Sequence, residues 1–85
     1  MAESPAMKNK FYEWTNEVFA QSPFDMKMNN LLSMAVALAL GHEGAVSYFY
    51  FSAKKAGATD VELAAAADIA AASIGLNLYT LIPKE

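Results

Sequence analysis

The stretch Ala56-Gly57-Ala58-Thr59-Asp60-Val61-Glu62 marks a turn between two helices and decides the fold class. Thr59 is a helix-capping residue type, and Glu62 stands three positions later, which is the capping-box pattern of a helix N-terminus. Gly57 follows Lys54 and Lys55, and basic residues followed by glycine are typical of a helix that ends in a left-handed turn. The stretch therefore predicts one helix that ends before Gly57 and a second that begins after Thr59.

The second of these helices continues through an alanine-rich run to Leu81, and Pro83 stops it. Alanine leaves little side chain in the way, so other helices can approach closely. This suits a tight bundle or a subunit interface. Asp68 is the exception in the run, and it either pairs with Lys54 or Lys55 across an interface or faces solvent.

The N-terminal segment predicts a helix with one apolar face. Ser4-Pro5 is a capping residue followed by proline at the first helical position, and Ser22-Pro23 ends the helix. Apolar residues recur between them at spacings of four, three and four: Met7, Phe11, Trp14 and Val18. The cluster Phe11, Tyr12 and Trp14 lacks a basic face for a membrane, so we expect it to dock on the chain's own bundle rather than on an outside surface.

Two more helices are expected between these ends. Asp25 can cap a helix that runs to Leu38 and is apolar on all sides, so this helix should be the most buried element. Gly41 breaks it, and the next helix begins near His42 and Glu43. That helix contains Tyr48-Phe49-Tyr50-Phe51, four consecutive residues that cover most of a helix circumference, so some face the core and others a neighbouring subunit. No strand pattern is left, and the sequence predicts an all-α fold, a small helical bundle.

Composition predicts assembly of this bundle into a homo-oligomer. A chain of 85 residues forms one domain and buries too small a core to be comfortably stable alone. Disulfides or a structural metal usually compensate, but the chain has no cysteine and only one histidine, so we expect no metal and no cofactor. Oligomerisation is left, and a hydrophobic content of 55% favours it.

Charge and hydropathy exclude several partner classes. Six basic against nine acidic residues argue against nucleic acid, which requires a basic patch. The apolar run 61–82 is long enough to span a bilayer, yet it carries Glu62, Asp68 and Asn77, so we expect no membrane span. The first five residues lack the basic start and apolar run of a secretory signal. Together with the absence of cysteine, this indicates a cytoplasmic protein.

The region from Asp25 to Leu81 resembles the carboxymuconolactone decarboxylase and alkyl hydroperoxidase D-like family. The matching features are Asp25 and Lys27 at the start of an apolar helix, then His42-Glu43-Gly44-Ala45, then Ala56-Gly57-Ala58-Thr59 with Glu62. The resemblance implies an all-α fold and assembly into homotrimers or homohexamers. It also suggests a division into an N-terminal helix, residues 1–24, that packs on a family-like core, residues 25–85.

The active residues of the family are absent at the matching positions. The thiol branch carries a Glu-x-x-Cys-x-x-Cys-x-x-x-His motif, which the resemblance places on Ala39, His42, Ala45 and Phe49. Thiol peroxidase or disulfide reductase chemistry needs a thiolate nucleophile and a resolving thiol, which these residues do not supply. The active residues of the decarboxylase branch are absent as well. The resemblance implies a histidine where this chain has Phe49 and an acid where it has Ala45.

Two functions are consistent with these observations. The first is a redox-inactive oligomeric module with a structural or binding role, whose partner beyond its own copies is a protein or a small organic acid. The second is a non-thiol enzyme or a binder of a lactone or carboxylate, with His42 and Glu43 as the candidate catalytic residues in an interface pocket. Adjacent residues point about 100° apart around a helix, so these two side chains need not face one ligand.

Overall fold

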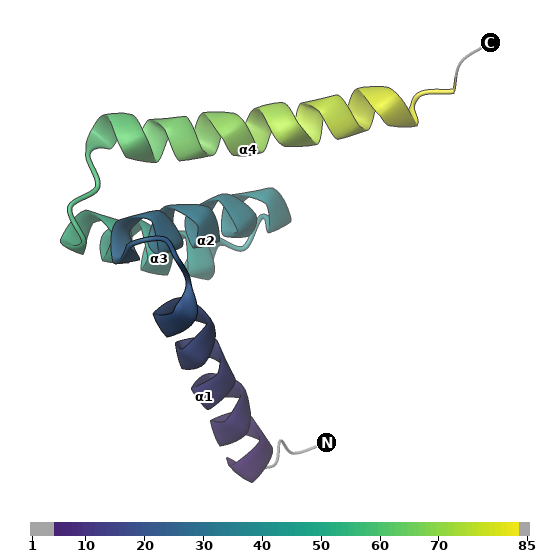
Figure 1. Cartoon of the computed structure of the whole chain (residues 1–85). Helices are drawn as coiled ribbons and strands as arrows, with labels where there is room; N and C mark the ends of the chain where they lie inside the picture. Colours follow the sequence, from purple (N-terminus) through teal and green to yellow (C-terminus); the bar gives the residue numbers. More distant parts are fainter. Residues whose placement is uncertain (1–4, 84–85) are drawn as a thin grey trace.

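The computed structural model describes residues 5–83 and contains the four predicted helices (Figure 1). They are α1 (Pro5–Gln21), α2 (Met26–Leu40), α3 (Glu43–Lys55) and α4 (Asp60–Leu81). No strand occurs within residues 5–83, so the predicted all-α fold is confirmed. Pro5 is the first residue of α1, as predicted, whereas its expected cap Ser4 lies outside the described residues.

The predicted helix-end signals operate through local hydrogen bonds. The Thr59 side chain accepts a hydrogen bond from the Glu62 backbone N–H, and the Glu62 carboxylate accepts one from the Thr59 N–H at 2.9 Å. Asp25 caps α2 by accepting a 2.8 Å hydrogen bond from the Met28 N–H. Gly57 has φ +98°, in the left-handed region that glycine adopts without steric cost. The sequence therefore sets where each helix begins and ends.

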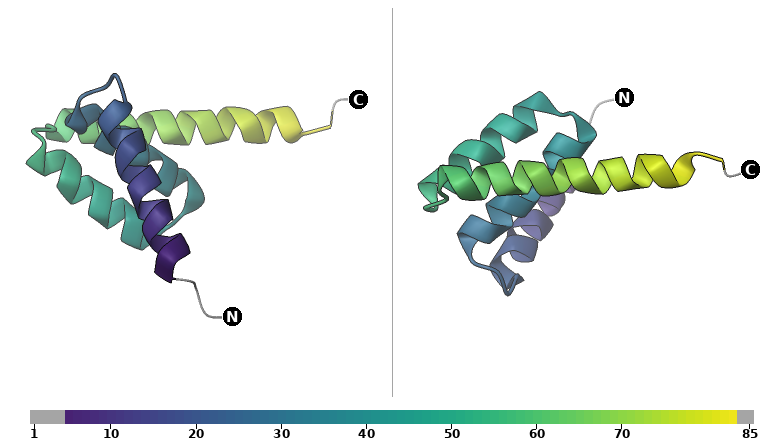
Figure 2. Two further views of the ribbon diagram at one scale, coloured as in Figure 1. Left: turned by 60° about the horizontal axis from the view of Figure 1, so that its bottom comes forward. Right: turned by 90° about the horizontal axis from the view of Figure 1, so that it is seen from above.

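The core lies where α2 meets α3 and α4. The helices α2 and α3 lie side by side, and α4 crosses over this pair (Figure 2). A cluster of buried residues joins the three helices: Leu31, Met34, Ala53, Ala58 and Leu63. Most of the buried residues belong to α2, which confirms that it is the most buried element. The cluster is small, and it contains only one large residue from α4.

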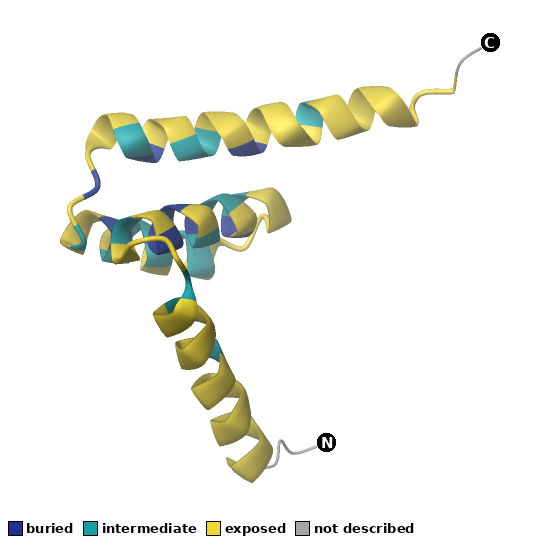
Figure 3. Ribbon diagram, in the orientation of Figure 1, coloured by how far each residue is buried: buried dark blue, intermediate teal, exposed yellow. Residues whose placement is uncertain are grey.

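The N-terminal helix departs from its predicted position. In the single chain, α1 projects away from the other three helices and buries none of its residues (Figure 3). Phe11, Tyr12 and Trp14 are 58%, 52% and 61% exposed, so the expected docking of this cluster on the chain's own bundle is not observed. The proposed boundary at residue 24 falls in the turn between α1 and α2, and the division into two parts stays a prediction.

Asn29 links α2 to the end of α1. Its side-chain amide donates a 3.2 Å hydrogen bond to the Phe19 carbonyl, and its Oδ1 accepts a 2.7 Å hydrogen bond from the Ser22 hydroxyl. Asn29 is buried, so these bonds satisfy polar groups that would otherwise be costly to bury. They connect the end of α1 and the following turn to α2.

The C-terminal half of α4 extends beyond α2 and α3 (Figure 1). Several large apolar residues of this half are exposed, including Leu76, Leu78 and Leu81. By length and composition alone, α4 is also long and apolar enough to cross a membrane. The expected absence of a membrane span, which rests on Glu62, Asp68 and Asn77, therefore stays a prediction.

Candidate functional site

The junction between α2 and α3 carries both candidate residues from the sequence. Gly41 ends α2 with φ +70°, and its N–H donates a 3.1 Å hydrogen bond to the Leu38 carbonyl. His42 follows in an extended conformation, and Glu43 is the first residue of α3. Gly41 is thus the break that the sequence predicted, and its positive φ explains why glycine is suited to this position.

His42 is the N-cap of α3. Its Nδ1 accepts a 3.0 Å hydrogen bond from the Ala45 backbone N–H. The side chain is exposed, and Nε2 makes no hydrogen bond within the described chain. Glu43 lies in the first turn of α3, where a negative charge is favourable to the helix dipole. Both residues therefore have local structural roles.

The two candidates do not share a pocket. Glu43 lines a shallow surface hollow together with Leu38, Gly41, Val46 and Ser47, and His42 is absent from this lining. His42 is the extended N-cap and not a residue of α3, so the expected 100° separation around a helix does not describe this pair. Within residues 5–83, no group of three or more histidine or acidic residues comes together in a way that could hold a metal ion.

The aromatic run of α3 divides between the core and the surface. Phe49 and Tyr50 are partly buried and pack against the core cluster. Tyr48 and Phe51 are 67% and 63% exposed. The predicted division of this run is confirmed on its core side, while the neighbouring subunit on the other side stays a prediction.

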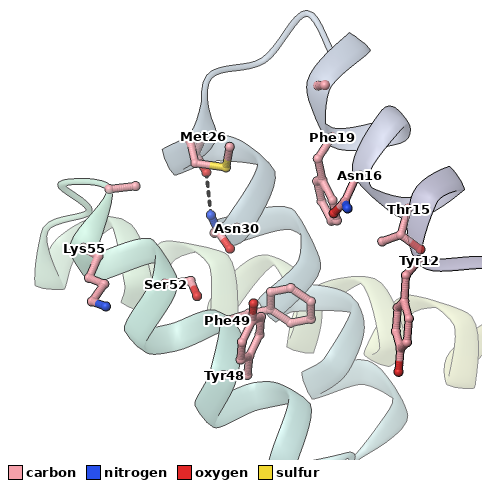
Figure 4. Close-up of a pocket in the computed structure, with 12 residues that line it drawn as sticks. Tyr12, Thr15, Asn16, Phe19, Met26, Asn30, Tyr48, Phe49, Ser52 and Lys55 are labelled. Carbon is pink, nitrogen blue, oxygen red and sulfur yellow. Dashed lines mark hydrogen bonds between the residues drawn. The ribbon is translucent and has the colours of Figure 1, made fainter. Parts of the chain in front are cut away.

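A larger groove lies between α1 and the α2–α3 pair (Figure 4). It has a volume of about 770 Å³. Aromatic, polar and small side chains line it: Tyr12, Thr15, Asn16, Phe19, Ala20, Met26, Asn30, Tyr48, Phe49, Ser52, Lys55 and Ala56. Phe49 is the position to which the family resemblance assigns a histidine. The groove therefore reaches the region where the family's chemistry is expected, but with an apolar ring in place of the base.

Sequence reasoning missed most of this groove. The sequence indicates Lys55 as a helix-dipole residue and as a possible partner of Asp68, and it indicates no role for Asn16, Asn30 and Ser52. They come together because α1 stands away from α3, and nothing in the local sequence predicts that angle. One signal was available: Tyr48, Ser52 and Lys55 are spaced by four and three, which places them on one face of α3.

Two ion pairs connect the start of α4 to the rest of the bundle. Lys27 Nζ lies 2.8 Å from a Glu62 carboxylate oxygen, and Lys54 Nζ lies 3.9 Å from Asp60. The hydrogen bond from Lys27, followed by that from the Thr59 N–H, lowers the pKa of Glu62, and the same contact with Glu62 raises the pKa of Lys27. Asp68 is exposed and has no ion pair within the described chain, and its pairing with Lys54 or Lys55 across an interface stays a prediction.

Comparison with known families gives a match over residues 5–79 to the carboxymuconolactone decarboxylase family. The chain belongs to this family. The match includes α1, whereas the resemblance in the sequence was placed from Asp25 onward. Comparison with curated proteins and with solved structures finds no match.

This family member lacks the thiol motif that the resemblance assigns to four of its positions. The four positions assigned to the thiol motif hold Ala39 on α2, His42 at the junction, and Ala45 and Phe49 on α3. Of these, only His42 can take part in acid–base chemistry, and its Nδ1 is used by the backbone. This family member therefore has the helical fold without the residues for thiol chemistry.

Proposed function

We propose that this family member is a redox-inactive helical module that functions as a homo-oligomer. The observation that carries the proposal is the surface of the single chain. It exposes 6868 Å², whereas a compact monomer of 9.2 kDa is expected to expose about 4900 Å². Stable interfaces bury about 800 Å² or more of each partner, so the excess is large enough for an extensive subunit contact.

The shape of the chain supports the same proposal. Its radius of gyration is 15.9 Å, against about 12 Å for a compact domain of this length. Exposed large apolar residues occur on α1, on α2 and on the outer part of α4, and buried apolar residues are few. Burial of these surfaces against other copies would supply the core that a single chain lacks. By analogy with its family, we propose a trimer or a hexamer.

Sedimentation velocity and light scattering at micromolar concentration test the assembly. We expect a single species of about three or six times the mass of the chain. Trp14 is the only tryptophan and is 61% exposed in the single chain, so its emission should be shifted to shorter wavelength in the assembly. A folded 9.2 kDa monomer with fully hydrated Trp14 would contradict the proposal. Co-flotation with lipid vesicles in place of self-association would assign the apolar surface to a membrane instead.

A second candidate function keeps the junction as a site for a lactone or carboxylate. The observation in its favour is that the His42 ring is exposed and its Nε2 is without a protein partner. The separate positions of His42 and Glu43 and the capping role of Nδ1 make it the weaker candidate. A thermal-shift screen with lactones, dicarboxylates and aromatic acids tests it. A stabilisation that disappears in His42→Ala would support a site at this junction.

A further inference from the structure

The groove between α1 and the α2–α3 pair has the dimensions of a small-molecule site. Its volume of about 770 Å³ lies within the range of ligand pockets. Four aromatic side chains line it, and they come from two helices: Tyr12 and Phe19 from α1, and Tyr48 and Phe49 from α3. Figure 4 shows the α1 and α3 side chains on opposite sides of the groove. Planar apolar groups pack well against such rings.

The charge of the groove is opposite to that of the chain. The chain has a net charge of −3, yet none of the twelve lining residues is acidic and Lys55 is the only charged one. The neighbouring Lys54 pairs with Asp60, and Lys27 pairs with Glu62. Lys55 makes no ion pair within the described chain. The groove therefore presents a cation that lacks a counter-ion.

Two neutral polar side chains in the groove also lack partners. Ser52 and Asn16 make no side-chain hydrogen bond within the described chain, although both line the groove. Ser52 lies three residues before Lys55, so both side chains are on the same face of α3. A hydroxyl and an ammonium group on one face can both donate to the same carboxylate.

We propose that this groove binds an aromatic carboxylate. The ring system lies among Phe19, Tyr48 and Phe49, and the carboxylate pairs with Lys55 and accepts a hydrogen bond from Ser52. This site is distinct from the His42–Glu43 junction, since neither of those residues lines the groove. The proposal goes beyond assembly, because it assigns a ligand class to this member of the family.

A second copy of the chain is the competing occupant of the groove. The apolar stripe of α1, Met7, Phe11, Trp14 and Val18, does not line the groove, which uses the face of α1 that carries Tyr12, Asn16 and Phe19. A subunit contact made by the stripe therefore uses a different face of α1 from the groove.

Isothermal titration of the full-length protein with 2-naphthoate tests the proposal, with 2-naphthamide as the uncharged analogue. We expect naphthoate to bind saturably and naphthamide to bind roughly fivefold more weakly. This factor is at the upper end of the affinity that an exposed ion pair contributes. Lys55→Gln should weaken naphthoate binding by a similar factor and leave naphthamide binding unchanged. Lys54→Gln is the matched control, since Lys54 is on the same helical turn but does not line the groove.

Amide chemical shifts locate the bound probe and distinguish the occupants. Naphthoate should shift the resonances of Tyr48, Phe49 and Ser52 more than those of His42 and Glu43. Three results would overturn the proposal: no saturable binding, equal affinity for acid and amide, or equal weakening by the two lysine variants. Intermolecular contacts between copies at Tyr48 and Ser52, with no effect of naphthoate, would assign the groove to a second copy. Circular dichroism of each variant checks that the helices are retained.

Discussion

At the scale of single residues, His42 occupies a position to which the family resemblance assigns a cysteine, and here its side chain caps a helix. The resemblance assigns the first cysteine of the thiol motif to this position, and the imidazole that replaces it caps α3. A cap supplies an acceptor for a backbone N–H that has no partner inside the helix. The consequence is that His42 contributes to stability whether or not the junction binds a ligand.

Substitution of His42 measures this contribution. We expect His42→Ala to lower the free energy of unfolding by about 1 kcal/mol, the usual effect of the loss of a cap. His42→Asn should restore it, because the amide oxygen can accept the same hydrogen bond from the Ala45 N–H. Urea unfolding of the three proteins under identical conditions is the measurement. An asparagine variant as unstable as the alanine variant would show that the cap is not the reason for the loss.

Other residues show the limit of local patterns. Asp25 and the Thr59–Glu62 pair act within three residues of each other, so the sequence predicted their hydrogen bonds correctly. Asn29 bonds to Phe19, ten residues away, and an asparagine in an apolar helix gives no indication of that partner. Local capping chemistry was therefore predictable, and the contact between Asn29 and the end of α1 was not.

At the scale of helices, Glu62 has two functions at the start of α4. It completes the capping box with Thr59, and it pairs with Lys27 on α2, so one carboxylate begins a helix and fastens it to its neighbour. In the alanine-rich remainder of α4, beyond Leu63 in the first turn, only Ala70 is buried. The position of α4 on α2 therefore depends strongly on this first turn.

The charge of Glu62 predicts a pH dependence of stability. Its folded-state pKa is lowered from 4.5, so its contribution is fully present above pH 4.5 and is lost as pH falls through the lowered value. The pKa of Lys27 is raised from 10.5, so its contribution is fully present below pH 10.5 and is lost as pH rises through the raised value. Between pH 4.5 and pH 10.5 the contribution of this ion pair to stability is therefore independent of pH.

Glu62→Gln isolates the charge, because glutamine can still serve the capping box. The wild type should melt at a higher temperature than this variant at neutral pH, and the difference should shrink between about pH 5 and pH 3. Lys27→Met should show the same loss of acid dependence, since it removes the partner that contributes most to the lowered pKa. Thermal melts followed by circular dichroism measure both. A difference between wild type and Glu62→Gln that stays constant with pH would contradict the role of the ion pair.

At the scale of the whole molecule, the sequence predicted the parts better than their arrangement. Periodicity correctly placed Met7, Phe11, Trp14 and Val18 on one helix and identified α2 as the central element. Periodicity did not predict that this stripe stays exposed in the single chain. The exposure of these side chains depends on the angle between α1 and the other helices, which the spacing of residues within one helix does not determine. The groove was missed for the same reason, since its two sides come from helices that meet only at that angle.

Phe11→Ser tests whether the stripe on α1 is an assembly surface. Phe11 is 58% exposed in the single chain, so its removal should cost the isolated bundle little. If assembly buries it, each lost side chain removes about 2 kcal/mol of apolar burial, which corresponds to a roughly 30-fold weaker subunit contact. Dilution followed by Trp14 emission and by sedimentation should then show dissociation at a higher protein concentration than for the wild type.

Asn9→Ser, an exposed polar change on the same helix, is the matched control and should leave the dilution curve unchanged. Equal curves for wild type, Phe11→Ser and Asn9→Ser would remove Phe11 from the interface and leave the exposed apolar residues of α2 and of the outer half of α4 as the surfaces that can join the copies.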